Sequence, residues 1–298
     1  MRIGVMFPGD ELSSDRDELV EWLDCAAECG FHHVVFGDHV VGVDPQFAPP
    51  GWNARFPGGA SARAYTNKDV FLDPFVLFGY IAARYEFELV TGIMVLPQRQ
   101  TVLVAKQAAE VDWLSGGRLR LGVSIGWNAA EYEALGVPVG HRAERFEEQI
   151  ELLRQLWTQE TVSFESPLHH LHGVGLLTLP IQRPIPIWLG GDSRVALERA
   201  GRIADGAFLP ARTLPTAEVA ETIAMMRAQA SAAGRDPDGI GIEPRLIAGG
   251  LDDDAIRALV NAWKSIGASH LCIDTRFGGF EEMGAHLAVL RRVSELGL

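Results

Sequence analysis

An aspartate and a histidine stand together directly after a short buried run of the sequence. Asp38 and His39 follow the apolar stretch 33–36 and precede a long segment rich in glycine and proline. A histidine exchanges protons near neutral pH, and a neighbouring carboxylate can orient its ring. Asp38 and His39 are therefore candidate catalytic residues. Their position is equally compatible with a structural histidine and with an aspartate that bonds the backbone of the turn.

A glycine pair offers a second kind of chemistry, the binding of an anion. The sequence Gly190-Gly191-Asp192-Ser193 lies between an apolar run and a helical pattern. Glycines allow the backbone to approach a ligand closely. The first turn of the following helix presents free N–H groups and the positive end of the helix dipole, which suits a phosphate. Asp192 or Ser193 could instead only cap the helix.

Residues for two common reaction types are scarce where strands are expected to end. A metal-dependent hydrolase needs several converging histidine and carboxylate ligands, and only Asp38, His39 and Asp192 are available there. A glycosidase needs two facing carboxylates, and only the same two aspartates qualify. A site with few acid–base groups and many glycines and aromatics suits an organic cofactor that carries the difficult chemistry itself.

Neither the cysteines nor a histidine cluster favours a metal site. Three cysteines, Cys25, Cys29 and Cys272, are too few and too scattered for a disulfide framework, and we expect them to behave as small buried hydrophobes. His169, His170 and His172 lie close together without a carboxylate or cysteine spaced to complete a zinc site. We therefore expect no bound metal.

The elements that must position these residues alternate between strand and helix. Apolar runs at 3–7, 33–36, 87–96, 118–125, 185–189, 206–209, 240–247 and 270–273 are each followed by a helical pattern, at 19–30, 72–83, 102–114, 144–157, 193–203, 217–233, 255–266 and 283–293. Continuously apolar strands indicate a parallel sheet buried on both faces. Eight strand–helix pairs predict a single α/β domain over 1–298, a (β/α)8 TIM barrel. An open doubly wound sheet is the alternative, but the segment 7–10 lacks its Gly-x-Gly-x-x-Gly fingerprint.

Two insertions interrupt this rhythm, one after strand 2 and one between helix 4 and strand 5. The first, 40–67, carries Phe47, Trp52, Phe56 and Tyr65. It leaves the C-terminal end of a strand, where barrel enzymes carry their active sites, so it is either a lid or a structural excursion. We expect Trp52, Tyr65 and the strand-end residue Arg276 to contact a small-molecule substrate. The second insertion covers 158–184.

The bulk composition excludes several partners. The chain has 298 residues, 47% of them hydrophobic, and a formal net charge of −13. An acidic chain without basic clusters is a poor ligand for nucleic acid or for anionic membrane surfaces. No apolar run approaches the length of a membrane span, and the N-terminal apolar stretch is too short for a signal peptide. These features predict a cytoplasmic enzyme.

The central part of the sequence resembles a known family. The stretch 114–136, LSGGRLRLGVSIGWNAAEYEALG, is similar to the signature of luciferase-like monooxygenases, and in particular of the branch that uses the deazaflavin coenzyme F420. Other matching pieces are Asp38-His39, 97–99, 105–109, 186–191 and 204–206, so the resemblance covers about 30–275. It implies a (β/α)8 barrel with the cofactor across its mouth, and a homodimer.

The resemblance also implies roles for individual residues. His39, with Asp38 beside it, faces the deazaflavin ring in such enzymes. A bulge at Gly92-Ile93, often with a non-proline cis peptide, supports the back of the ring. The loop Gly190, Gly191, Asp192 and Ser193 holds the phosphate, and Trp127 and Asn128 also contact the cofactor. F420-dependent sugar-phosphate dehydrogenases carry a glutamate where this sequence has Trp127, so we expect a larger, less polar substrate.

The function that these implications favour is hydride transfer between C5 of the deazaflavin and an organic substrate that the sequence does not identify. An FMN-dependent monooxygenase that uses molecular oxygen is the first alternative. A non-catalytic protein that binds F420 or a flavin is the second, and a metal-dependent barrel hydrolase is the third.

Overall fold

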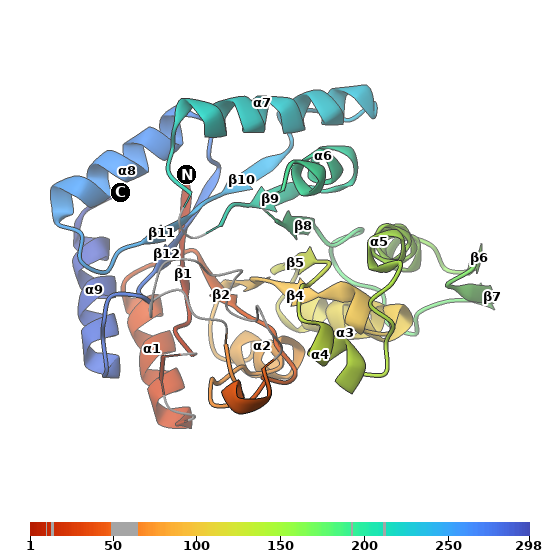
Figure 1. The fold of residues 1–298 in the computed structure, drawn as a ribbon, viewed down its shortest axis with the longest axis horizontal. Coiled ribbons are helices and arrows are strands. Elements are labelled where there is room, and N and C mark those ends of the chain that lie inside the picture. The colour runs from red at the N-terminus through yellow and green to blue at the C-terminus, as the bar shows by residue number, and fades with distance from the viewer. Residues whose placement is uncertain (10, 13–14, 49–64, 192, 211–212) are drawn as a thin grey trace.

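Parallel strands form the centre of the protein, and helices surround them (Figure 1). The computed structural model describes residues 1–9, 11–12, 15–48, 65–191, 193–210 and 213–298. The strands of the main sheet are β1 (Arg2–Met6), β2 (His33–Phe36), β3 (Glu88–Thr91), β4 (Met94–Val95), β5 (Leu119–Ser124), β8 (Ile187–Gly190), β9 (Gly206–Phe208), β10 (Gly241–Glu243), β11 (Arg245–Ile247) and β12 (His270–Asp274). They follow the order β10-β9-β8-β5-β3-β2-β1-β12-β11, with β4 paired to β5.

Two of the predicted strands are each divided in two. Pro244 separates β10, which pairs with β9, from β11, which pairs with β12, because proline has no N–H for the ladder. The two ends of the strand order are therefore consecutive in the chain, and the sheet is nearly closed. The peptide bond Gly92-Ile93 is cis and lies between β3 and β4. With each divided strand counted once, the described residues form the eight strands that the sequence predicts, and the barrel is confirmed.

Most of the helices begin where the sequence supplies capping groups. The helices are α1 (Arg16–Glu28), α2 (Pro74–Ala82), α3 (Thr101–Leu114), α4 (Ala129–Ala134), α5 (Arg142–Thr158), α6 (Arg194–Ile203), α7 (Ala217–Ala232), α8 (Asp253–Ser265) and α9 (Met283–Glu295). The side chains of Asp15, Asp73, Ser193, Thr216 and Asp252 accept hydrogen bonds from the first backbone N–H groups of α1, α2, α6, α7 and α8. Such caps satisfy donors that the helix cannot.

The structure contains elements that the apolar pattern did not predict. The short helix α4 follows β5 directly, and the strands β6 (Val162–Glu165) and β7 (His170–Val174) form an antiparallel hairpin in the second insertion. The hairpin extends beyond α5, at the right of Figure 1. In the described part of the first insertion, residues Pro45–Phe47 form a turn of 3-10 helix, η1. Trp52 and Phe56 lie outside the described residues.

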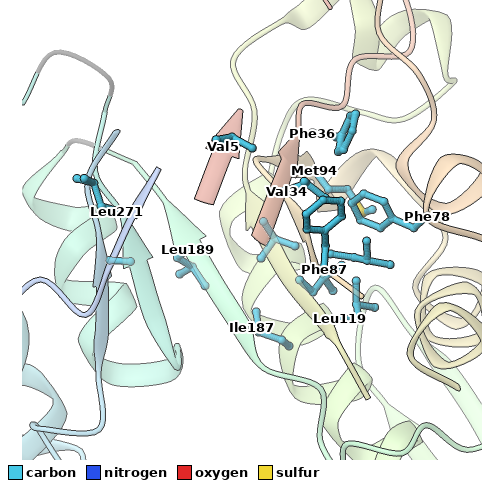
Figure 2. Packing of buried hydrophobic residues seen from close by; sticks show 14 of the residues in the cluster. Val5, Val34, Phe36, Phe78, Phe87, Met94, Leu119, Ile187, Leu189 and Leu271 are labelled. Atoms are coloured by element: carbon cyan, nitrogen blue, oxygen red, sulfur yellow. The ribbon is translucent and has the colours of Figure 1, made fainter. Parts of the chain in front are cut away.

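Strand side chains pack in two directions. Those that point outward meet the helices, as Figure 2 shows for Val34, Phe36 and Met94 beside Phe78 of α2. The rings of Phe36 and Phe78 meet edge to face, with 5.9 Å between their centroids. A smaller cluster faces the barrel axis: Met6, Val35, Val90, Trp188, Phe208 and Cys272. Burial of a large apolar side chain contributes about 1.5–3 kcal/mol, so these two layers hold the strand ends in place.

Candidate functional site

His39 lies in the loop after β2, with its side chain 21% exposed. Its Nδ1 is 3.4 Å from Oε2 of Glu131. The ring of Tyr65 stacks on the imidazole with 3.8 Å between centroids, and Phe71 meets it edge-on at 4.9 Å. His39 is thus held at the strand end on one edge and one face, while part of its surface remains accessible.

Glu131 is the residue that organises this cluster. Its carboxylate is 1% exposed and also accepts hydrogen bonds from the Val40 N–H at 2.6 Å, from Gln98 Nε2 at 3.0 Å and from the Tyr65 hydroxyl at 3.4 Å. Burial by itself would raise the pKa of Glu131, but its hydrogen bonds, with His39 first among them, lower that pKa below its ordinary value. Glu131 is therefore an ionised, buried acceptor.

The sequence reasoning missed Glu131, although it lies within the stretch that carried the resemblance. Glu131 belongs to the first turn of α4, a helix too short for a clear apolar period. Asn128 caps this helix, and its side chain accepts the Glu131 N–H at 3.2 Å. Its Nδ2 also donates to the Tyr65 hydroxyl. The spacing Asn128-x-x-Glu131 is that of a capping box and could have signalled a helix start here.

Asp38 has its own partner. Its carboxylate accepts two hydrogen bonds from Nη2 of Arg99, at 2.9 and 3.0 Å, and one from Nε at 3.3 Å. Arg99 in turn donates to Asp73, the cap of α2, at 3.1 Å. Burial raises the pKa of Asp38, and Arg99 opposes that rise. This ion pair fixes the loop after β2, and Glu131 rather than Asp38 contacts the His39 ring.

Gly92, Ile93 and Gly190 come together at the same end of the barrel. The cis peptide expected at Gly92-Ile93 is present. A Cβ on Gly190 would lie 1.6 Å from Cδ1 of Ile93, so a side chain at the end of β8 would have to displace the end of Ile93. Arg245 donates to the carbonyl of Gly92 at 3.4 Å. The parallel register aligns β2 with β3, β4 with β5, and β5 with β8. The contact of Ile93 with Gly190 therefore lies at the same edge of the barrel as the His39 cluster.

The remaining predicted cofactor and substrate residues have different surroundings. Gly191 and the exposed Ser193 follow β8, and Ser193 caps α6 through the Ala196 N–H at 3.2 Å. Asp192, like Trp52, lies outside the described residues. Trp127 meets Tyr65 edge-on at 5.7 Å and so adjoins the His39 cluster.

Arg276, expected to contact substrate, is almost fully buried. Its guanidinium donates to Asp274 through Nε at 3.0 Å and through Nη2 at 2.8 Å. Burial would raise the pKa of Asp274, and Arg276 lowers it. The ion pair commits two of the nitrogens of Arg276 to the end of β12.

His169 and His170, in the second insertion, are bound to other groups. His169 contacts Thr101 and Glu148, and His170 contacts Glu165. Within the described ranges, the histidines and carboxylates close enough to share an ion are His32, His33 and Glu88. These three residues lie at the N-terminal ends of β2 and β3, away from His39. Both oxygens of Glu88 are already paired with the guanidinium of Arg120.

Comparisons with known proteins agree with this architecture. Over 179 residues the chain is 32% identical to the FMNH(2)-dependent dimethylsulfone monooxygenase of Pseudomonas putida, covering 59% of this chain and about half (48%) of that relative. Over 260 residues it is 30% identical to the phthiodiolone/phenolphthiodiolone dimycocerosates ketoreductase of Mycobacterium sp. (strain JLS), covering 82% of this chain and 68% of the relative.

Solved structures share the fold at low identity. The monooxygenase RslO1 from Streptomyces bottropensis superposes with a TM-score of 0.77 at 21% identity, covering 99% of this chain and 98% of that one. The coenzyme F420 dependent tetrahydromethanopterin reductase from Methanopyrus kandleri gives 0.74 at 15% identity, covering 99% and 97%.

No helix within the described residues is both long and apolar enough to span a membrane.

The family assignment rests on most of the chain. Residues 1–283 match the family described as luciferase-like monooxygenase, whose members include oxidoreductases and monooxygenases. The chain therefore belongs to the luciferase-like monooxygenase family.

Proposed function

We propose that this protein is an F420-dependent oxidoreductase that transfers a hydride between C5 of the deazaflavin and an organic substrate. The observation that carries the proposal is the His39 cluster. It presents a partly exposed imidazole, held by a buried carboxylate and an aromatic ring, at the strand ends of a barrel. An imidazole in that position can accept or donate the proton that accompanies hydride transfer to or from a carbonyl.

The residues at the mouth fit a flat, phosphorylated cofactor. The bulge at Gly92-Ile93 and the glycine of β8 pack so closely that a side chain on Gly190 would displace Ile93. Gly191, Asp192 and Ser193 lead into the first turn of α6, where free N–H groups suit a phosphate. Trp127 and Asn128 would complete the site. When bound, F420 would supply the hydride-carrying carbon.

The chain's own residues would divide the remaining work. His39 would hold the transferred proton, and Tyr65 and Glu131 would keep its ring in place. Trp127 provides no carboxylic proton donor at its position. The carboxylates of Glu131 and Asp38 are both held by other donors, so His39 would act as the acid or base. Tyr65, with Trp52 and Arg276, would shape the substrate side, and the aromatic character favours a substrate larger and less polar than a sugar phosphate.

The comparisons leave two cofactors open. The relative that covers 82% of this chain is by name a ketoreductase, and reduction of a ketone is a hydride transfer, which favours F420. The relative at 32% identity is an FMNH(2)-dependent monooxygenase, and this makes an FMN-dependent monooxygenase the second candidate.

One binding experiment separates these candidates. Purified apo-protein would be titrated with F420 and with FMN, and bound cofactor would be followed by fluorescence. We expect F420 to bind at least tenfold more tightly, a difference of about 1.4 kcal/mol. Tighter binding of FMN would instead support the monooxygenase. Tight F420 binding without turnover of any ketone or secondary alcohol tested would support a non-catalytic binding protein. Turnover of phosphorylated sugars alone would refute the proposed substrate class.

We also propose a homodimer, supported by apolar side chains on neighbouring helices. Val76 and Tyr80 on α2, and Val102 and Leu103 on α3, are 76%, 37%, 42% and 51% exposed. α2 and α3 pack against each other, and exposed apolar patches mark interaction surfaces. Light scattering of the purified protein should give twice the chain mass, and Val76→Glu should reduce it to one chain. A wild-type protein that runs as a monomer would refute this.

A further inference from the structure

The carboxylate of Glu131 is surrounded by donors. Oε1 accepts the Val40 N–H at 2.6 Å, and Oε2 faces Gln98 Nε2 at 3.0 Å, the Tyr65 hydroxyl at 3.4 Å and His39 Nδ1 at 3.4 Å. A backbone N–H and an amide NH2 can only donate. Each oxygen of Glu131 therefore faces a group that can only donate, which favours the ionised carboxylate and agrees with the lowered pKa of Glu131.

The protonation of the imidazole follows from this arrangement. A neutral histidine carries one proton, and the nitrogen that holds it is set by the partner of the other nitrogen. The buried carboxylate of Glu131 has no proton to donate, so Nδ1 of His39 must be the donor. At 3.4 Å this contact is long, as catalytic hydrogen bonds often are before a substrate binds. We infer that Glu131 is a positioning residue that fixes His39 in the Nδ1–H tautomer and leaves Nε2 as the proton-accepting atom of the site.

The packing around the ring supports a fixed orientation. Tyr65 stacks on one face of the imidazole, with an interplanar angle of 25°, and Phe71 meets it at 88°. The hydroxyl of Tyr65 also donates a hydrogen bond to Glu131 and accepts one from the side-chain amide of Asn128. One helix start, α4, therefore supplies the carboxylate and helps to hold the stacking ring, and the geometry of His39 depends on residues about 90 positions further along the chain.

Glu131→Gln tests this inference because the amide has only one acceptor. The Val40 N–H must keep the amide oxygen, since a backbone donor cannot face an NH2 group. The NH2 group then takes the place of Oε2, and Gln98 must turn its amide so that its oxygen faces this group. Nδ1 of His39 must also accept from the NH2 group, so the proton moves to Nε2. The variant changes no volume and keeps the Val40 hydrogen bond, so the helix and the loop should remain in place.

The measurement is the 15N spectrum of the histidine side chains at about pH 9, where an ordinary imidazole is neutral. The chain has 9 histidines, and His39→Gln identifies the signals of His39 by their loss. In the wild type we expect a protonated Nδ1 and an unprotonated Nε2. In Glu131→Gln we expect the two types to exchange. The matched control is Glu133→Gln, an exposed position on the same helix, which should leave the wild-type pattern unchanged.

Two outcomes would overturn the inference: a wild-type His39 protonated on Nε2, or a Glu131→Gln spectrum identical to that of the wild type. The wild-type spectrum decides the point even if the variant does not fold. The inference rests on the proposed function only for the use of Nε2, and the tautomer is measured without any cofactor. If F420 proves to be the wrong cofactor, the spectrum still tests the tautomer of His39 independently.

Where turnover is measurable, the same variant separates positioning from binding. We expect Glu131→Gln to lower kcat on the order of 10²–10⁴-fold, the range that general acid–base catalysis contributes, with cofactor affinity within about threefold of the wild type. An unchanged kcat despite an exchanged tautomer would show that Nε2 does not handle the proton.

Discussion

Replacing Arg120 with methionine should strongly destabilise the barrel, because a buried cation would be removed while its two carboxylates remain. The side chain of Arg120, on β5, is 2% exposed. Its guanidinium donates to both oxygens of Glu88 at 3.1 Å and forms a close ion pair with Glu243, which is 1% exposed. It also lies 4.3 Å from the ring centroid of Trp188. Methionine retains most of the apolar contact and none of the charge.

The magnitude follows from the burial of the partners. Loss of one member of a buried ion pair costs about 3–5 kcal/mol, because the other charge is left uncompensated. Total stabilities of domains are only about 5–15 kcal/mol, so this loss should be prominent in an unfolding curve. Burial would raise the pKa of Glu243, but Arg120 and then His33 lower it far below its ordinary value. A carboxyl group with a lowered pKa stabilises the folded protein at pH values above its unfolded pKa, and this stabilisation is lost as the pH falls. The difference in stability between Arg120→Met and the wild type should therefore shrink at low pH.

Urea unfolding at pH 7 is the assay, with two comparisons. Arg16→Met removes the same side chain from an exposed pair, in which Arg16 and Asp17 are 80% and 81% exposed, and should leave the midpoint unchanged. Arg120→Met combined with Glu243→Gln removes the stranded charge and should recover at least about 1.5 kcal/mol of the loss, within the range of coupled pairs. If Arg120→Met unfolds at the midpoint of Arg16→Met, or if the double variant is no more stable than the single one, the reasoning is refuted.

Three further outcomes are expected. His39→Ala should lower turnover at saturation by about 10²–10⁴-fold with cofactor affinity nearly intact, whereas a loss of affinity alone would make His39 a ligand-positioning residue. Gly190→Ala would place its Cβ 1.6 Å from Ile93 and should weaken cofactor binding at least about tenfold. The control Gly79→Ala places its Cβ in open space and should leave cofactor binding unchanged. Equal cofactor titration curves for the two variants would contradict this prediction. Burial lowers the pKa of His270 to about 3, below the unfolded value, so the free energy of unfolding should fall by about 1.6 kcal/mol between pH 6.5 and 5. This decline should be absent from His270→Gln, and a pH-independent wild type would show the assignment to be wrong.

The barrel could be predicted from the sequence because its strands and helices differ in period and punctuation. The eight runs were short, mostly apolar and separated by helical patterns, as expected of a parallel sheet covered on both faces. The caps Asp73, Ser193 and Asp252 stand where α2, α6 and α8 begin. These signals are local, since they depend on backbone sterics and on burial of neighbouring residues.

The candidate site was predicted only in part. The cis bond at Gly92-Ile93 agrees with the resemblance, and His39 lies at the mouth as its place after β2 indicated. Asp38, beside it in the sequence, is bound to Arg99 instead. α4 and the β6–β7 hairpin gave too short a pattern to be detected, and with α4 the carboxylate of Glu131 was missed.

The order, type and approximate bounds of the barrel's strands and main helices followed from the sequence, and with them the edge of the barrel at which chemistry can occur. Which charges meet depends on how the chain folds in three dimensions. The pair of His39 and Glu131 joins residues 92 positions apart, and that of Arg120 and Glu243 joins residues 123 apart. Arg120 sits in a strand that the apolar pattern described as uniformly buried. The hydrophobic periodicity of a segment indicates that a side chain is buried. The partner that compensates its charge depends on closure of the sheet, which brings together strands that are distant in sequence.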